Sequence, residues 1–199
     1  MHDFATYFLG NARANSQRVN ALLNEVRTIS IKKSTVLQER GDDLKHAYFV
    51  KSGLLRSFTV DEKGKEHIFM FAPEGWIISD IQSTASQSPA ILTIDALEDT
   101  VVQVIRSDVF EELVNLHMGN EPEFARLELN RLLRRIGVLQ KRVLLMLSAS
   151  ATERYHEFVS TYPNLQQRVS QKSIASYLGI TPEALSRLRV ELIKNQRKV

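Results

Sequence analysis

Apolar residues recur at alternating spacings of four and three along residues 122–147, which predicts one long amphipathic helix. The repeat begins at Ala125 and continues through the six residues that we expect in a dimer interface: Leu129, Leu132, Ile136, Leu139, Val143 and Met146. A 4–3 repeat held over about three heptads is typical of a coiled-coil seam and favours a parallel homodimer. We therefore assign residues 119–147 to a dimerisation helix. The alternative is a helix that is buried only against its own chain.

A different pattern occupies residues 28–106, where short runs of β-forming residues alternate with turn residues. Four of the turns contain glycine at nearly even spacing: Gly41, Gly53, Gly64 and Gly75. The run Asp61–Lys65 has the composition of a hairpin turn. Evenly spaced short strands are typical of a small antiparallel sandwich or barrel. Since residues 1–27 and 109–116 are expected to be helical, we place this domain within residues 1–118.

The segment Val169–Lys194 is organised as a helix, a tight turn and a second helix. Ser170 is a favourable N-cap for the first helix, and Gly179 follows its last apolar residue, where a left-handed backbone often ends a helix. Thr181 caps the second helix and Pro182 takes its first position. This arrangement predicts a helix-turn-helix motif, which places its second helix in the DNA major groove.

The second helix of this motif has an apolar side and a polar side. Leucines form the apolar side: Leu185, Leu188 and Leu192. The opposite side presents four residues: Glu183, Ser186, Arg187 and Val190. An arginine can pair with both acceptors of guanine, and a glutamate can accept from the cytosine amino group, so we predict Arg187 and Glu183 as base-reading residues. A surface helix stabilised by a Glu183–Arg187 ion pair is the alternative.

Charge is distributed unevenly along the chain. Residues 126–199 hold 14 Lys and Arg against 5 Asp and Glu, whereas residues 1–125 hold 12 against 18. A basic part joined to an acidic part is expected of a protein that binds nucleic-acid phosphates through one module. We therefore predict double-stranded DNA as a partner and assign residues 148–199 to a DNA-binding domain. Arg189, among the basic residues around Arg187, is an expected phosphate anchor.

Composition argues against several other classes of protein. The chain has no cysteine, which excludes disulfides, thiolate catalysis and cysteine-ligated iron–sulfur clusters. No apolar run approaches the roughly 20 residues that a membrane helix needs, and the N-terminal run MHDFATYFLG lacks the features of a signal peptide. These observations predict a cytoplasmic protein without a membrane partner. His46, His67 and His117 are too scattered to predict a metal site, so we expect no metal and no cofactor.

Three features together resemble the Crp/Fnr family of bacterial transcription regulators: the glycine-punctuated strands with AYFVKSGLLRSF, the long helix, and the string VSQKSIASYLGITPEALSRLR. The resemblance extends from about Ser30 to Asn195. It implies an α+β fold, in which an N-terminal antiparallel β-roll of the cyclic-nucleotide-binding type (a double-stranded β-helix or jelly roll) precedes the dimerisation helix and the helix-turn-helix domain. It also implies a homodimeric, sequence-specific regulator acting on a two-fold symmetric operator, and not an enzyme. RNA polymerase is a further candidate partner.

Within the helix-turn-helix motif (hereafter the reading motif), the resemblance assigns roles to residues by their position. Glu183 and Arg187 fall where the base-reading Glu and Arg of the family lie, with Ser186 between them. Three residues fall at the start of the preceding helix, which contacts phosphates in the family: Ser170, Gln171 and Lys172. Pro182 falls where many relatives carry a third reading residue, so one base contact is expected to be missing. The β-hairpin wing that follows the second helix in most relatives is also expected to be missing.

The sensor site departs from the family pattern. The Gly-Glu-Leu turn of nucleotide-binding members maps onto Ser79–Ile81, and their Arg-Ser or Arg-Thr pair maps onto Ala90–Ile91. Asp80 could accept a ribose hydrogen bond, but Ala90 offers no charge for a cyclic phosphate, and residues 66–105 contain no Lys or Arg. We therefore expect no control by a cyclic nucleotide. A candidate pocket for an unidentified small-molecule effector combines these positions with the dimer-helix pair that reads the adenine in such members: Ser79, Asp80, Ala90, Ile91, Leu139 and Gln140.

Two other functions stay open at this point. The first is a small-molecule sensor that acts through protein contacts and carries a vestigial DNA-binding domain, which would bind duplexes of every sequence weakly. The second is an enzyme built on a cupin-like barrel with a bound metal, which would need clustered His and carboxylate ligands.

Overall fold

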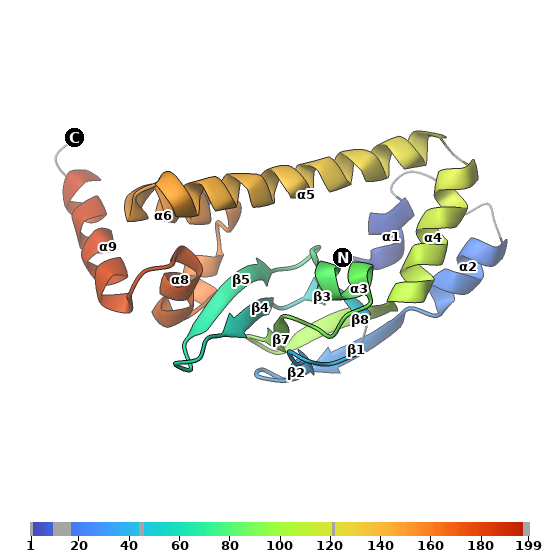
Figure 1. Ribbon diagram of the computed structural model, residues 1–199, viewed down its shortest axis with the longest axis horizontal. Coiled ribbons are helices and arrows are strands. Elements are labelled where there is room, and N and C mark those ends of the chain that lie inside the picture. Colours follow the sequence, from blue (N-terminus) through green and yellow to red (C-terminus); the bar gives the residue numbers. More distant parts are fainter. Residues whose placement is uncertain (1, 10–16, 44–45, 121, 197–199) are drawn as a thin grey trace. The chain divides into compact units, whose positions relative to one another are not determined.

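The computed structural model describes residues 2–9, 17–43, 46–120 and 122–196 (Figure 1). The chain divides into two compact units, which we describe separately. The first unit consists of Met1–Lys63 and Phe69–Arg126, and the second consists of Gly64–Ile68 and Leu127–Val199.

The described residues contain eight strands: β1 (Arg27–Ile31), β2 (Val36–Gln38), β3 (His46–Ser52), β4 (Leu55–Val60), β5 (Glu66–Ala72), β6 (Ile77–Ser79), β7 (Thr93–Ala96) and β8 (Thr100–Arg106). They form two four-stranded sheets, in the orders β1-β8-β3-β6 and β2-β7-β4-β5. Strand β8 pairs antiparallel with both β1 and β3, and β7 pairs antiparallel with β2 and β4. The predicted antiparallel β-roll is therefore confirmed.

Two of the glycine turns show why glycine is required there. The predicted hairpin turn joins β4 to β5, and Gly64 within it has a φ of +75°. Gly53, between β3 and β4, has a φ of +96°, and a Cβ at this position would lie 2.7 Å from the Cα of Thr100. A side chain at Gly53 would therefore collide with backbone as well as strain the turn.

The first core cluster joins helices to the sheet of β3 and β8. The helices of the first unit are α1 (Phe4–Leu9), α2 (Gln17–Asn24), α3 (Ile81–Ser86) and α4 (Ser107–Asn120). Buried residues of this cluster come from α1, α2, β3, β8 and α4: Phe4, Phe8, Val19, Leu22, Phe49, Ile105, Val109 and Leu113. The amide of Phe4 also donates to the buried Gln103 side chain at 2.7 Å. The first helices are therefore part of the core.

A second core cluster is formed by residues of the two sheets: Tyr48, Val50, Leu55, Ala72, Ile78, Ile94, Ala96 and Val102. Strands β3 and β7 supply these side chains from alternate positions, namely Tyr48 and Val50 in β3 and Ile94 and Ala96 in β7, as expected where one face of a strand is buried.

The helical predictions for this unit are largely confirmed. Helix α4 contains the predicted segment 109–116 and extends it at both ends. Residues 1–27 contain α1 and α2, whereas residues 10–16 lie outside the described residues. The helical prediction is wrong at Arg27, because this residue begins β1 and pairs with Val104.

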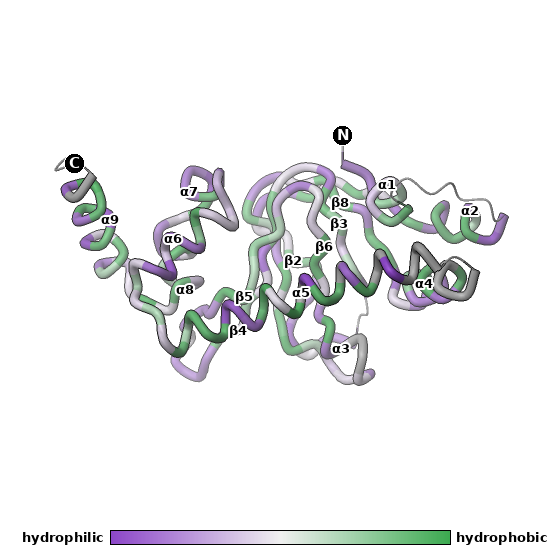
Figure 2. The backbone as a smooth tube through the Cα atoms, turned by 90° about the horizontal axis from the view of Figure 1, so that it is seen from above, coloured by the Kyte–Doolittle hydropathy of each residue, from purple (hydrophilic) through white to green (hydrophobic). Residues whose placement is uncertain are grey.

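The helices of the second unit are α5 (Pro122–Ser148, whose first residues up to Arg126 belong to the first unit), α6 (Ala151–Thr161), α7 (Leu165–Arg168), α8 (Gln171–Leu178) and α9 (Pro182–Gln196). The predicted helix over residues 122–147 is confirmed by α5, along which hydrophobic and hydrophilic residues alternate in Figure 2. Ser150 and Glu153 form a capping box at the start of α6, and the hydrogen bonds from the Ser150 amide and hydroxyl lower the pKa of the Glu153 carboxyl. None of the helices in the described residues has the length and apolar character needed to cross a membrane.

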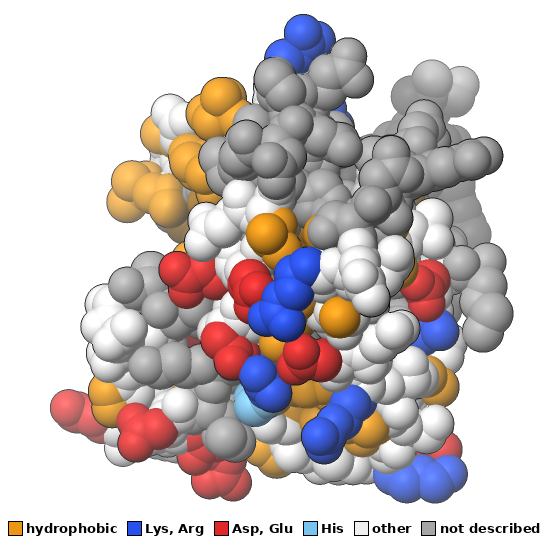
Figure 3. Space-filling model, turned by 90° about the vertical axis from the view of Figure 1, so that its right-hand side faces the viewer, with side chains coloured by type: hydrophobic (Ala, Val, Ile, Leu, Met, Phe, Trp, Pro, Cys, Tyr) orange, Lys and Arg blue, Asp and Glu red, His pale blue; other side chains and the backbone are white. Residues whose placement is uncertain are grey.

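Acidic and basic side chains are intermixed on the face of the molecule in Figure 3. In the first unit, Arg18 pairs with Glu112 at 2.7 Å, and Arg106 contacts both Glu25 and Asp108. Exposed pairs of this kind contribute little to stability. The surface of the first unit around these pairs carries both signs of charge. Residues 126–199 of the sequence, in contrast, hold more basic than acidic residues.

Candidate functional site

The predicted helix-turn-helix motif is formed by α8 and α9. The Ser170 hydroxyl accepts a hydrogen bond from the Ser173 amide at 3.0 Å, and Gly179 ends α8 with a φ of +68°. The Thr181 hydroxyl accepts from the Ala184 amide at 3.2 Å, and α9 begins at the predicted proline. The local sequence signals for both helices and for the turn are therefore confirmed.

A shared core fixes the two helices to α6 and α7. Buried residues of this core come from all four helices: Tyr155, Phe158, Leu165, Ile174, Ala175, Leu178, Leu185 and Leu188. The ring of Phe158 lies 5.5 Å from the ring of Tyr177 and 5.6 Å from that of Tyr162. Aromatic contacts of this kind contribute about 0.5–1.5 kcal/mol each beyond the burial of their area. The motif is therefore a packed body rather than a loose pair of helices.

The outward side of α9 carries the residues that the sequence assigned to base reading. Glu183, Ser186, Arg187 and Val190 are all exposed, whereas Leu185 and Leu188 are buried. The hydrogen bond from its own main-chain amide, followed by one from the Thr181 hydroxyl, lowers the pKa of the Glu183 carboxyl. Glu183 is therefore ionised near neutral pH and can act as an acceptor. In the described residues, Glu183 and Arg187 form no ion pair within 4 Å, which does not support the ion-pair alternative.

The residues predicted to contact phosphates occupy two different places. Ser170, Gln171 and Lys172 are exposed at the start of α8. Arg189 is half-buried and lines a groove of about 290 Å³ between α6, α7 and α9, together with Tyr155, His156, Val159, Gln166, Leu192 and Ile193. Two residues correspond to about 200° around a helix, so Arg189 faces away from the side that Arg187 occupies. Its role as a phosphate anchor stays a prediction.

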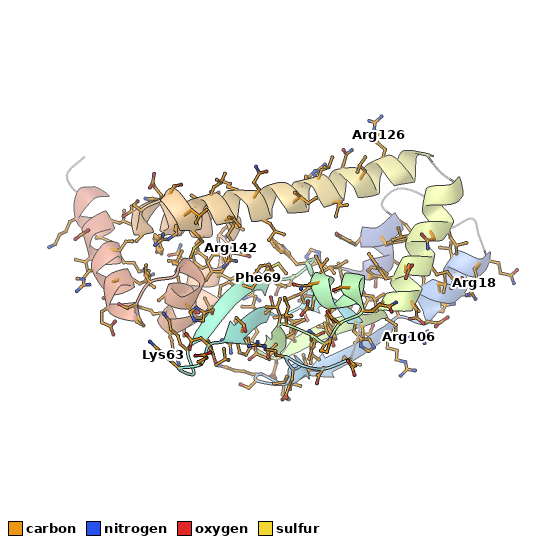
Figure 4. All side chains as sticks on the ribbon, in the orientation of Figure 1. Arg18, Lys63, Phe69, Arg106, Arg126 and Arg142 are labelled. Carbon is orange, nitrogen blue, oxygen red and sulfur yellow. The ribbon has the colours of Figure 1, made fainter. Side chains whose placement is uncertain are left out.

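Long-range hydrogen bonds that the sequence did not predict hold α8 at Ser176 and Tyr177. The Ser176 hydroxyl donates to the Glu66 carbonyl at 2.6 Å and accepts from the Ile68 amide at 3.1 Å. The side chain of Arg142, labelled in Figure 4, donates from Nη2 to the Ile68 carbonyl at 2.9 Å and to the Tyr177 carbonyl at 3.4 Å. All of these residues belong to the second unit. The partners are far apart in sequence, so no local pattern could have indicated these contacts.

The predicted dimer seam is an exposed apolar row along α5. Its six residues retain between 38 and 57% of their accessible surface: Leu129, Leu132, Ile136, Leu139, Val143 and Met146. Met146 also contacts the turn of the motif, because a Cβ on Gly179 would lie 2.7 Å from its methyl group. A contiguous exposed row of large apolar residues marks an interaction surface.

At the candidate sensor site, Asp80 is buried and its carboxylate is held by main-chain groups. One oxygen accepts from the Ser83 amide at 3.1 Å, and the other accepts from the Ile91 and Leu92 amides at 2.7 and 2.9 Å. Both Asp80 oxygens therefore already accept hydrogen bonds from the protein's own amides, and the role of Asp80 as a ribose acceptor stays a prediction.

The remaining pocket residues have different surroundings. Ser79 ends β6, Ala90 is buried and the Ile91 side chain is exposed. Within the first unit, the hydrogen bond from the Ile91 amide brings Ile91 next to Asp80. Leu139 and Gln140 are exposed on α5 in the second unit. Whether these two residues join a pocket with Asp80 stays a prediction.

The histidines lie on separate elements. His46 is half-buried in β3, where burial, followed by the nearby Arg106 charge, lowers its pKa. His67 is exposed in β5 and His117 belongs to α4. Among the described residues, no three His, Cys, Asp or Glu side chains are grouped so as to hold a metal ion.

Comparison with known proteins gives the family of this chain. A family model for the cyclic nucleotide-binding domain matches residues 28–117. The anaerobic regulatory protein of Haemophilus influenzae is 31% identical over 189 residues, which cover 87% of this chain and 70% of that protein.

Two solved structures show the same fold at lower identity. FixK2 from Bradyrhizobium japonicum is 20% identical with a TM-score of 0.70, and the match covers 86% of each chain. A protein from Eubacterium rectale described as a transcriptional regulator of the Crp/Fnr family is 20% identical with a TM-score of 0.68, covering 95% of this chain and 88% of that one.

These likenesses agree with the architecture, in which β-roll sheets of the cyclic-nucleotide-binding type are followed by helices. Proteins of this family bind DNA, typically as dimers. The chain belongs to the Crp/Fnr family of transcription regulators, which are not enzymes.

Proposed function

We propose that this protein is a homodimeric, sequence-specific DNA-binding regulator that acts on a two-fold symmetric operator without control by a cyclic nucleotide. The observation that carries the proposal is the outward side of α9. It presents the ionised Glu183 carboxylate and the Arg187 guanidinium from a helix whose other side is buried. This pair suits readout of cytosine and guanine edges in the major groove.

The exposed α5 row supports the homodimer. Residues at a and d positions of a coiled coil lose their exposure only when a second helix packs against them, and the regular 4–3 spacing fits a parallel copy of α5. A dimer would present two recognition helices to half-sites about 34 Å apart, so the operator would share the two-fold symmetry of the protein.

The exposed start of α8 supports phosphate contacts. Ser170, Gln171 and Lys172 offer hydroxyl, amide and ammonium donors, and the Ser170 hydroxyl already caps the helix. Such contacts position a protein on DNA without reading sequence. The surrounding basic excess would strengthen binding at low salt.

Independence from cyclic nucleotides is supported by the first unit. Residues 66–105 contain no Lys or Arg that could hold a cyclic phosphate, and Asp80 already uses the main-chain amides of Ile91 and Leu92. A buried phosphate without cationic partners would be strongly unfavourable.

Selection of bound duplexes from a random pool tests this proposal. The purified protein is incubated with the pool, with and without cyclic AMP, and the bound duplexes are sequenced. We expect an enriched palindrome whose half-sites are about one helical turn apart, and the same palindrome in both arms. Enrichment without sequence preference would instead indicate the alternative, a sensor with a vestigial DNA-binding domain. A palindrome found only with cyclic AMP would contradict the proposed independence.

A further inference from the structure

The Asp80 carboxylate occupies a position that is unusual for a charged group. It is 3% exposed, at the junction between β6 and α3, and it accepts hydrogen bonds from three main-chain amides. An ionised carboxylate is costly to bury unless hydrogen bonds replace its hydration. Charge-assisted bonds from amides supply this replacement and are stronger than bonds between neutral groups.

The three amides come from two separate turns of the chain. The Ser83 amide is in the first turn of α3, whereas the Ile91 and Leu92 amides precede β7. Asp80 therefore closes residues 80–92 into a loop whose two ends meet at one carboxylate. No Lys or Arg occurs within residues 66–105, so this segment itself offers an anion only main-chain amides and uncharged side-chain donors.

Other hydrogen bonds keep the loop in the same conformation. The Ser83 hydroxyl donates to the Ser88 carbonyl at 2.8 Å, and the Ala90 amide donates to the Asp42 carbonyl at 2.9 Å. The Gly41 amide in turn donates to the Ala90 carbonyl at 2.7 Å. The segment is thus fixed to the β2–β3 connection on one side and to Asp80 on the other.

We propose that Asp80 is a built-in anionic ligand of this cyclic nucleotide-binding domain, which orders residues 80–92 in place of an external anion. Amides directed at one point bind the phosphate or carboxylate of a ligand in many proteins. Here the chain supplies the anion itself, and its negative charge disfavours a phosphate at the same place. The inference deepens the proposed function, on which it rests only for the independence from cyclic nucleotides.

Chemical rescue tests the proposal with the full chain. Asp80→Ala removes the carboxylate and leaves the three amides beside a space that formate can fill. The thermal midpoint is measured for the wild type, for Asp80→Ala and for the exposed-site control Asp43→Ala, in sodium formate and in sodium chloride at equal ionic strength. We expect Asp80→Ala to melt below the wild type and to recover with formate but not with chloride. The wild type and Asp43→Ala should respond alike to both salts.

Equal responses of Asp80→Ala and Asp43→Ala to formate would overturn the proposal, as would a rise in the wild-type midpoint with cyclic AMP. If Asp80→Ala does not fold, Asp80→Asn keeps the size and removes the charge. Hydrogen exchange at the Ile91 and Leu92 amides should then be about tenfold faster than in the wild type, with Val102 unchanged. Unchanged exchange at these two amides would also overturn it. None of these measurements uses DNA, so a failure of the proposed DNA binding is distinguishable from a failure here.

Discussion

The guanidinium of Arg142 lies 4.0 Å from the centre of the Tyr177 ring, which joins the long helix α5 to the first helix of the reading motif. A cation over an aromatic face contributes about 0.5–2 kcal/mol, depending on how far it is removed from water. The same side chain donates to the Ile68 carbonyl, and Tyr177 packs against Phe158. Arg142 therefore stabilises α8 through several partners at once.

Replacing this arginine should destabilise the second unit. Arg142→Ala removes the ring contact and the hydrogen bond to Ile68, and we expect the free energy of unfolding to fall by about 1–3 kcal/mol. Urea unfolding followed by circular dichroism measures the change. The matched control is Lys141→Ala, because Lys141 forms an exposed ion pair with Glu157 and such pairs contribute at most about 1 kcal/mol. Equal losses in the two variants would contradict the assignment.

Gly179 is constrained by its backbone and by a neighbour. Gly179→Ala should lower the free energy of unfolding by about 1–2 kcal/mol through its φ of +68° alone, and crowding of the Met146 methyl group should add to this loss. The double variant Gly179→Ala/Met146→Ala gives the coupling between the two sites. Gly64→Ala, at a φ of +75° with open space around its Cβ, provides the loss from the backbone alone. A smaller loss for Gly179→Ala than for Gly64→Ala would show that Met146 imposes no constraint.

We expect Arg187 to determine the sequence preference of DNA binding, whereas phosphate contacts should affect the affinity for all duplexes. Arg187→Ala is expected to cost about 1–3 kcal/mol on the selected duplex and to relax the preference at one base pair of each half-site. Lys172→Ala should instead weaken binding to all duplexes to a similar extent and reduce the dependence on salt. Fluorescence anisotropy on the selected duplex and its point variants, at two salt concentrations, separates the two effects. An unaltered preference in Arg187→Ala would refute the assignment of this residue.

The α5 seam is tested by moving one charge around the helix. Ile136→Asp places a carboxylate on the predicted seam, whereas Val138→Asp places it at another exposed apolar position of the same helix, since these residues are 51% and 59% exposed. We expect Ile136→Asp to shift the protein to monomer in sedimentation experiments, because a charge at an a or d position must be buried in the dimer. Val138→Asp should sediment as the wild type does. Dimers of undiminished stability in Ile136→Asp would argue against the predicted interface.

The depressed pKa of His46 predicts how stability depends on pH. Burial favours the neutral imidazole in the folded state, so the unfolded chain binds more protons between the lowered folded pKa and the ordinary value of 6.5. Stability contributed by His46 is therefore complete above pH 6.5 and is lost as the pH falls through the folded pKa. Urea unfolding from pH 5 to 8 should show a smaller pH dependence in His46→Gln than in the wild type. A pH dependence in His46→Gln as large as that of the wild type would contradict this prediction.

Local signals in the sequence predicted the reading motif almost completely. Ser170, Gly179 and Thr181 mark helix ends through hydrogen bonds and backbone angles that involve residues only a few positions away. Heptad spacing predicted α5, and the glycine turns predicted a small antiparallel β domain of short strands. In each case the determining interaction is local or periodic.

The interactions that the sequence did not predict connect distant segments. The Ser176 hydroxyl donates to the Glu66 carbonyl, and the Asp80 carboxylate accepts from the Ile91 and Leu92 amides. A single sequence specifies residue types but not which pairs meet, so the partners of a buried polar side chain depend on the complete fold. The roles of these residues therefore became visible only in the structure.

The packing of α1 and α2 limits how this protein can be cut into fragments. The match to the cyclic nucleotide-binding domain begins at residue 28, but Phe4, Phe8, Val19 and Leu22 complete the cluster against β3, β8 and α4. An excised fragment starting at residue 28 would expose the apolar surface of β3, β8 and α4 that α1 and α2 cover, and it would be prone to aggregate. Expression of the cyclic nucleotide-binding domain alone should therefore include Phe4 and Phe8, and a cleavable affinity tag needs a spacer before Phe4.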